Sequence, residues 1–151
     1  MKIAEALSIR KDLQKRIAQL QGRIANNVKV QEGDEPLENP DQLLKELDGC
    51  LSQLEDIIFR INATNMQVKN AKGVSLTQLM ARRDVLTIRI NTLRNVFNTA
   101  SESQNRYSQS EIRMVTVVDV KKLSKQIDKL SANLRVLDME IQGLNFSAEL
   151  I

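Results

Sequence analysis

Four stretches of the chain repeat apolar residues at alternating spacings of three and four. The four stripes are Ile3, Ala6, Arg10, Leu13, Ile17, Leu20 and Ile24; Leu44, Leu47, Leu51, Leu54, Ile58, Ile61, Asn65 and Val68; Leu76, Leu79, Arg83, Leu86, Ile90, Leu93, Phe97 and Ala100; and Val120, Leu123, Ile127, Leu130, Leu134, Leu137, Ile141 and Leu144. On an α-helix this spacing places the members of a stripe on one side, and a mean period of 3.5 is typical of coiled-coil seams. The pattern therefore predicts four long helices, over about residues 2–26, 40–69, 75–103 and 119–143.

Signals for helix starts stand at three of these boundaries. Asn39 can cap a helix whose first residue is Pro40. Ser75 and Gln78 have the spacing of a capping box, and Asp119 is a candidate cap for the last helix. About five residues separate the second helix from the third, which predicts an antiparallel hairpin between them.

Two shorter stretches have the pattern of strands. Residues 112–118, with the sequence Ile-Arg-Met-Val-Thr-Val-Val, are β-branched and partly alternating, and residues 28–30, Val-Lys-Val, also alternate. Strands this short need support from packed helices. We expect the two segments to form a short two-stranded β arm.

The predicted fold is therefore all-α, a single helical domain over residues 1–151. We expect an elongated antiparallel four-helix bundle or coiled coil that carries the β arm. Aromatic residues make up only 3% of the chain, which fits an aliphatic helical core. Because the stripes are narrow, one chain buries little apolar surface by itself, and we expect a homo-oligomer.

Charge and apolar runs exclude several partners. The 22 basic and 19 acidic residues give a net charge of +3, and aromatic stacking platforms are lacking, so we expect no nucleic-acid binding. The longest apolar run is three residues, 57–59, so we expect no integral membrane segment. The lone Cys50 excludes an intramolecular disulfide and is expected to be a partly buried hydrophobe. With no leader-like N-terminal pattern, a cytoplasmic location is expected.

Catalytic chemistry finds little support. The chain contains no histidine, which excludes Ser-His-Asp and Cys-His nucleophiles and any zinc site that uses imidazole. Glu32, Asp34 and Glu35 could supply a carboxylate-only metal site, but their spacing does not match a calcium-binding loop. We expect no enzyme activity, no cofactor and no metal.

Three polar residues occupy positions within the apolar stripes: Arg10, Asn65 and Arg83. Asparagine at such a position commonly fixes helix register, which is the role expected for Asn65. A guanidinium inside a bundle must be paired with carboxylates or carbonyls. Three interpretations stay open for the two arginines: an internal ion-pair network, a pocket for an anionic ligand, or side chains that reach out to water.

A second polar concentration lies on the connection before the last helix. It contains the single tyrosine, and connections held by rigid helices often carry binding residues. We expect it to converge with one of the arginines above and with acidic residues elsewhere. The candidate polar cluster is Arg83, Asp84, Arg106, Tyr107, Glu111 and Glu32.

Four short motifs follow one another along the chain. They are Ala4-Glu5-Ala6-Leu7, Val30-Gln31-Glu32-Gly33-Asp34-Glu35-Pro36, Ala81-Arg82-Arg83-Asp84-Val85-Leu86 and Arg106-Tyr107-Ser108-Gln109-Ser110-Glu111-Ile112. In this order they resemble a small, largely uncharacterised bacterial family that carries the label septicolysin, and the resemblance covers most of the chain. The label implies a membrane-active, cytolytic protein.

The residues themselves favour a different function. Helical stripes without a catalytic motif predict a non-catalytic cytoplasmic scaffold or interaction protein that assembles as an oligomer. Two alternatives stay open: a septicolysin-like membrane-active protein, and a ligand- or metal-binding protein with an Arg-carboxylate pocket.

Overall fold

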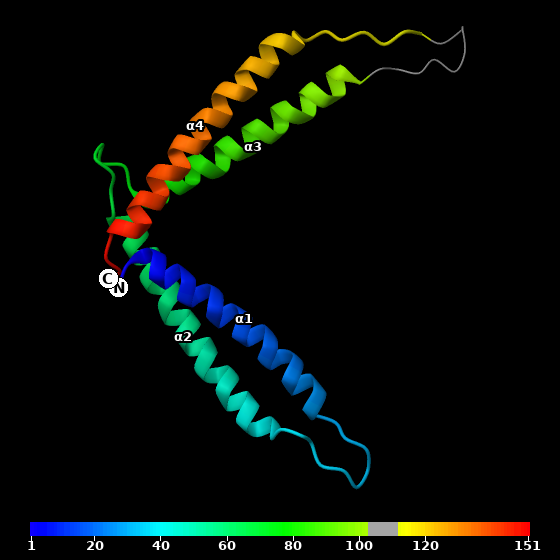
Figure 1. Cartoon of the computed structure of the whole chain (residues 1–151), viewed down its shortest axis with the longest axis vertical. Coiled ribbons are helices and arrows are strands. Elements are labelled where there is room, and N and C mark those ends of the chain that lie inside the picture. Colours follow the sequence, from blue (N-terminus) through cyan, green and yellow to red (C-terminus); the bar gives the residue numbers. More distant parts are fainter. Residues whose placement is uncertain (103–111) are drawn as a thin grey trace. The chain divides into compact units, whose positions relative to one another are not determined.

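The computed structural model describes residues 1–102 and 112–151, and within them the chain forms four helices (Figure 1). These are α1 (Ile3–Asn27), α2 (Pro40–Gln67), α3 (Leu76–Ser101) and α4 (Val120–Ser147). The all-helical class and the four predicted helices are therefore confirmed for the described residues. α4 continues past the predicted end near residue 143, because Gly143 keeps a negative φ and does not terminate it.

Side-chain caps start two of the helices where the sequence placed them. The Asn39 Oδ1 atom accepts hydrogen bonds from the backbone amides of Asp41 at 2.9 Å and Gln42 at 3.4 Å. At α4, the Asp119 Oδ1 atom accepts from the Lys122 amide at 3.0 Å. The amide oxygen of Asn39 and the carboxylate oxygen of Asp119 thus accept hydrogen bonds from backbone amides that a helix start leaves without intrahelical partners.

The chain divides into two compact units. The first contains Met1–Leu76 and Gln142–Ile151, and the second contains Thr77–Ile141. α1 and α2 belong to the first unit, α3 and most of α4 to the second. The predicted single domain, and the predicted hairpin between α2 and α3, concern the relation between these units and stay predictions.

In the first unit, α1 and α2 lie side by side and antiparallel (Figure 1). The buried core between them also includes a residue from the C-terminal tail. Its members are Ala6, Leu13, Ile17, Leu20, Leu43, Cys50, Ile57, Ile61 and Leu150. Two ion pairs also join the two sides of the hairpin: Arg16 with Glu46, and Arg23 with Glu38.

The predicted stripe of α2 was wrong at three of its eight positions. Leu44, Leu51 and Ile58 were expected to face inward, but they are exposed. The preceding residues, Leu43, Cys50 and Ile57, are buried in their place. Leu47, Leu54 and Ile61 do face the core as predicted, so the inward stripe is rotated by one residue at alternate turns.

The other three stripes are confirmed. Every member of the predicted α1, α3 and α4 stripes is buried or half-buried in the structure. In α3 the most buried are Leu76, Leu79 and Ile90, and in α4 they are Ile127 and Ile141. The 3.5-residue period therefore located the inward side of these three helices.

The predicted β arm is not formed in the described part of the chain. The isolated bridges there join Lys2 to Glu149 and Lys69 to Ser75, so neither involves the expected strands. Residues 28–30 instead enter a loop that the Asn27 side chain closes, since its Oδ1 atom accepts from the Glu38 amide at 2.9 Å. Residues 112–117 have no regular secondary structure, the chain bends at Val118, and no β-bridge joins the segment to another part of residues 1–102 and 112–151.

Candidate interaction surfaces

The two ends of the chain are joined within the first unit, and Figure 1 shows the termini beside each other. We call this contact of residues 1–3 with residues 147–151 the terminal clasp. The Leu150 amide donates to the Met1 carbonyl at 2.8 Å, and the Ile3 amide donates to the Ala148 carbonyl at 3.2 Å. These two bonds form a short antiparallel pairing between the chain ends.

α2 holds the far end of the clasp. The Thr64 hydroxyl accepts from the Ile151 amide at 3.1 Å and donates to the Arg60 carbonyl at 2.7 Å. The Arg60 Nε atom donates to the Ile151 carbonyl at 2.7 Å. Thr64 is fully buried, so its hydroxyl links the tail to α2 in a place where water cannot substitute.

Charge reinforces the same contact. Glu149 accepts the Lys2 ammonium at 2.6 Å and the N-terminal amine at 3.0 Å. The hydrogen bond from Lys2, followed by that from the N-terminus, lowers the pKa of the Glu149 carboxyl. Sequence reasoning missed this site, because its residues lie 145 or more positions apart and carry no motif.

A second set of charged contacts fixes the α1–α2 register. Arg16 donates to Glu46 through Nε at 3.1 Å and Nη2 at 2.7 Å, and this pair raises the pKa of the guanidinium. Near the loop, Arg23 forms a two-pronged pair with Glu38, which lowers the pKa of the Glu38 carboxyl. Bidentate pairs of this kind add geometric specificity.

The exposed apolar side of α2 is the first candidate interaction surface. We call Leu44, Leu51 and Ile58 the outer stripe; they are spaced by seven residues and are 44%, 45% and 37% exposed. A shallow groove of about 520 Å³ runs along the C-terminal part of this side. Its lining residues are Leu51, Leu54, Glu55, Ile58, Phe59 and Asn62. Apolar side chains gathered in this way are typical of contact surfaces.

The second candidate surface is a groove in the second unit. It has a volume of about 640 Å³ and lies between the C-terminal half of α3 and residues 114–118. α3 contributes Val96, Thr99 and Ala100, among others. The extended residues are held there by the Thr116 hydroxyl, which donates to the Ala100 carbonyl at 2.9 Å.

Only part of the predicted polar cluster can be placed. Arg83 donates to its neighbour Asp84 through Nε at 3.0 Å and Nη2 at 2.8 Å. Arg106, Tyr107 and Glu111 lie outside the described residues. The convergence of these groups therefore stays a prediction.

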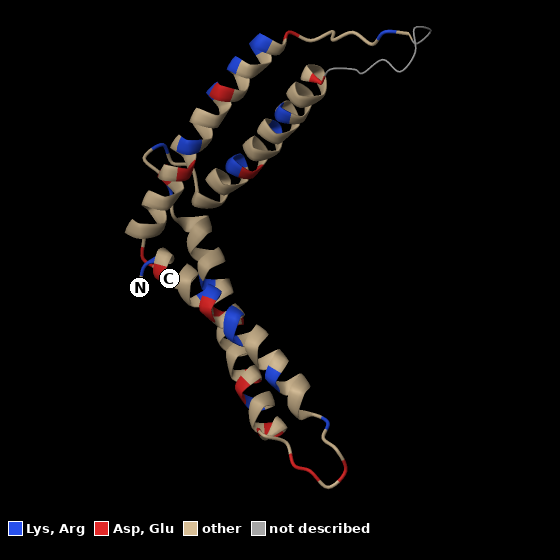
Figure 2. Cartoon of the chain, turned by 45° about the vertical axis from the view of Figure 1, so that its right-hand side comes forward, with Lys and Arg blue, Asp and Glu red and all other residues tan. Residues whose placement is uncertain are grey.

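The remaining predicted positions lie in the first unit. Glu32 is exposed on the acidic loop that joins α1 to α2, visible in Figure 2. Arg10 is half-buried on α1 and forms no ion pair with a described residue. Asn65 is buried on α2, and Cys50 is a buried free thiol in the core, as expected for a small hydrophobe.

A metal site and a membrane-spanning helix each have requirements that the described residues do not meet. Among residues 1–102 and 112–151, no three acidic or cysteine side chains gather closely enough to hold a metal ion. Over the same part of the chain, none of the helices combines the length and apolar character needed to cross a membrane.

Comparison with known proteins gives two matches of full or nearly full length. Residues 10–150 match the model of DUF6847, a family of unknown function. The chain is also similar to a solved structure described as the crystal structure of a functionally unknown conserved protein from Corynebacterium diphtheriae. The two share 35% sequence identity with a TM-score of 0.91, over 100% of this chain and 99% of that one. The comparison with curated proteins gave no match.

These matches correct the resemblance suggested by the four short motifs. The family found over residues 10–150 is one of unknown function, and neither match has a septicolysin-like name. One of the motifs, Ala4-Glu5-Ala6-Leu7, lies before the matched residues altogether. The septicolysin assignment is therefore wrong, and the cytolytic activity that it implied loses its basis.

Proposed function

The chain belongs to DUF6847, a family of unknown function, and we propose that it is a non-catalytic helical scaffold whose copies assemble through the outer stripe of α2. The observation that carries this proposal is the number of apolar columns on α2. A helix that contacts a single neighbour needs two apolar positions in every seven residues, whereas one that contacts two neighbours needs three. α2 has three, and α1 covers only two of them.

The outer stripe is suited to a second copy of itself. Leu44 and Ile58 stand seven residues to either side of Leu51. A two-fold contact between α2 helices, whether parallel or antiparallel, therefore brings Leu51 against Leu51 of the partner subunit. Such an isologous contact closes on itself and uses every residue twice.

Burial of the outer stripe would favour association. Burying the exposed part of each outer-stripe side chain contributes roughly 1 kcal/mol, and a symmetric contact buries six such side chains. Phe59, which is exposed beside the groove, adds apolar surface at the edge. Oligomeric assembly would thus provide the burial that the two-helix core of the first unit does not.

The same proposal includes the expectations about enzyme activity, cofactors, nucleic acid and location. We propose that the chain is not an enzyme and binds neither a cofactor nor nucleic acid. We place it in the cytoplasm, where a free thiol such as Cys50 stays reduced.

Light scattering after size-exclusion chromatography tests the assembly. The wild-type chain should have a defined mass that is a multiple of 17.1 kDa. Leu51→Glu should lower that mass, because it places a charge on each side of the contact. Val136→Glu is the matched control, since Val136 is an exposed apolar residue of α4 outside the stripe.

A wild-type monomer at about 100 μM, where even weak dimers form, would refute the scaffold function. A Leu51→Glu variant of unchanged mass would exclude the outer stripe as the interface.

A further inference from the structure

Arg10 is a half-buried arginine on α1 that forms no ion pair with a described residue. A guanidinium that is partly withdrawn from water calls for a carboxylate or carbonyl partner. Arg10 precedes the core residue Leu13 by three positions and Arg16 follows it by three, so the two arginines lie about 60° to either side of it. Because Arg16 pairs with Glu46 on one face of the hairpin, Arg10 belongs to the other face.

The outer stripe of α2 lies on the same face of the hairpin as Arg10. Glu46 precedes the core residue Cys50 by four positions, and Leu51 follows it by one. These two side chains are therefore turned away from Cys50 in opposite directions, by about 40° and about 100°. Since Glu46 marks the face of Arg16, Leu51 and the outer stripe mark the face of Arg10.

Arg10 also lies level with the middle of the outer stripe. The pair between Arg16 and Glu46 places these two residues at the same height, and α1 and α2 are antiparallel. Arg10 stands six residues before Arg16, so it is level with Ser52, six residues after Glu46. A second copy that docks on the outer stripe therefore comes within reach of the Arg10 guanidinium.

Two carboxylates border the outer stripe on its other side. Leu47 and Leu54 lie on the α1 side of Leu51 and pack against the core. Asp48 and Glu55 are displaced from Leu51 in the opposite direction, by about 60° and about 40°. Both are exposed and form no ion pair with a described residue, and Glu55 also lines the shallow groove. We call Asp48 and Glu55 the acidic edge.

We propose that the α2 helices of two copies run parallel, and that Arg10 of each copy pairs with Glu55 of the partner subunit. A two-fold axis along the helices places the acidic edge of each α2 beside α1 of the other copy. Glu55 then stands three residues, or about 4.5 Å of helix rise, from the level of Arg10. The symmetry gives two such ion pairs, one at each side of the apolar contact.

The antiparallel orientation brings like charges together instead. A two-fold axis across the helices turns the two acidic edges toward each other, so Asp48 stands within one residue of the level of Glu55 of the partner subunit. The same axis brings the levels of the two Arg10 residues to within about 3 Å of helix rise. Like charges across a contact cost affinity and select against the arrangement that contains them. Charge therefore favours the parallel orientation, although the apolar stripe fits both.

The inference rests on the proposed assembly through the outer stripe, and single cysteines separate the two claims. In a Cys50→Ala background, Leu51→Cys should form a disulfide-linked dimer in either orientation. Leu44→Cys and Ile58→Cys should each do so when the helices are parallel. In an antiparallel contact the two copies of either residue are about 21 Å apart along the helices, beyond disulfide reach. Trapping at position 51 alone would overturn the parallel orientation and leave the outer stripe as the interface. Trapping at none of the three would overturn both.

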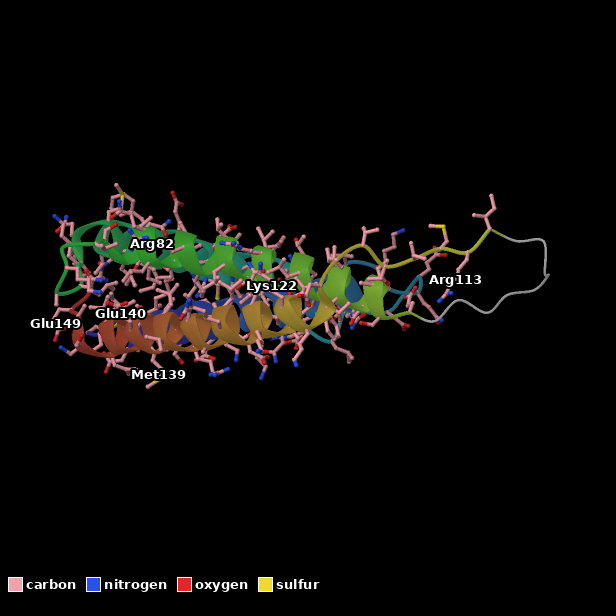
Figure 3. The ribbon with its side chains drawn as sticks, turned by 90° about the horizontal axis from the view of Figure 1, so that it is seen from above. Arg82, Arg113, Lys122, Met139, Glu140 and Glu149 are labelled. Carbon is pink, nitrogen blue, oxygen red and sulfur yellow. The ribbon has the colours of Figure 1, made fainter. Side chains whose placement is uncertain are left out.

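Charge reversal tests the pair between Arg10 and Glu55. Arg10→Glu and Glu55→Arg should each raise the dimer dissociation constant roughly tenfold, because both ion pairs become repulsive. An equimolar mixture of the two variants should restore about the wild-type constant, since their altered charges complement each other across the contact. This recovery also shows that both variants fold. Arg82→Glu makes the same charge change on α3, where Figure 3 labels the residue, and should leave the constant unchanged.

Two results of the charge reversal would overturn the proposal. A mixture that binds no more tightly than the separate variants would show that the two residues do not meet between copies, because mixing cannot restore a pair within one chain. A Glu55→Arg dimer tighter than wild type would indicate the antiparallel orientation, in which the new cation faces Asp48 of the partner subunit.

Discussion

Cys50 and Leu51 are adjacent in α2, yet Cys50 is 6% exposed in the core against α1, while Leu51 is 45% exposed on the outer stripe. One residue turns a helix by about 100°, so the two side chains point in different directions. The smaller and less apolar of the two is the one that the hairpin buries. The larger apolar side chain is the one that the hairpin leaves exposed.

The same division two turns earlier in α2 predicts two different responses to alanine. Leu43→Ala should lower the free energy of unfolding by about 2–4 kcal/mol, because the residue is buried and leaves a cavity. Leu44→Ala should leave the stability of the isolated hairpin nearly unchanged and weaken self-association instead. Urea unfolding and light scattering measure the two effects. Equal losses of stability would mean that both residues face the same core.

Thr64→Val should destabilise the chain by about 1–2 kcal/mol, because it removes the buried hydroxyl that accepts from the Ile151 amide and donates to the Arg60 carbonyl. Thr87→Val is the matched control. Thr87 makes the same kind of bond to the carbonyl four residues earlier, that of Arg83, but it is exposed on α3. Thermal unfolding compares the two variants, and an equal shift in both would show that the tail contact contributes nothing.

The terminal clasp predicts a dependence on acid pH. The folded chain lowers the pKa of Glu149 below its ordinary 4.5, chiefly through Lys2. The carboxylate therefore stabilises the fold above pH 4.5, and this contribution is lost as the pH falls through the lowered value.

Glu149→Gln should accordingly be less stable than wild type at pH 7, and the difference should diminish below pH 4.5. Urea unfolding at a series of pH values measures it. In a Lys2→Met background the same substitution should have a smaller effect, because the main partner is gone. A difference that stays constant from pH 7 to pH 3 would contradict this account.

Apolar spacing was sufficient to predict the all-helical class and the four helices. It located the four helices, and Asn39 and Asp119 marked two of their starts through cap chemistry that is local in sequence. Spacing could not select between Leu43 and Leu44, because α2 carries apolar residues in both columns. The inward column is decided by α1, whose position is not encoded in the periodicity of α2.

The contacts that connect distant residues could not be predicted in this way. Lys2 and Glu149 are ordinary charged residues until the fold brings the termini together. Residues 112–118 have a β-prone sequence, but preference alone does not specify a partner strand, and no β-bridge joins them to another described residue. The predicted polar cluster depends on Arg106, Tyr107 and Glu111, which are outside those residues, so it stays a prediction.

Disulfide trapping at position 51 tests most directly whether copies of the chain meet through the outer stripe. Cys50→Ala removes the native thiol, and Leu51→Cys then places a single cysteine on the two-fold contact in either helix orientation. Mild oxidation should give a covalent dimer in high yield, because such a contact brings the two residues within disulfide reach. Ser52→Cys in the same background, on an exposed position turned toward α1, should give little. Equal trapping at positions 51 and 52, or none at 51, would contradict the assembly proposed here.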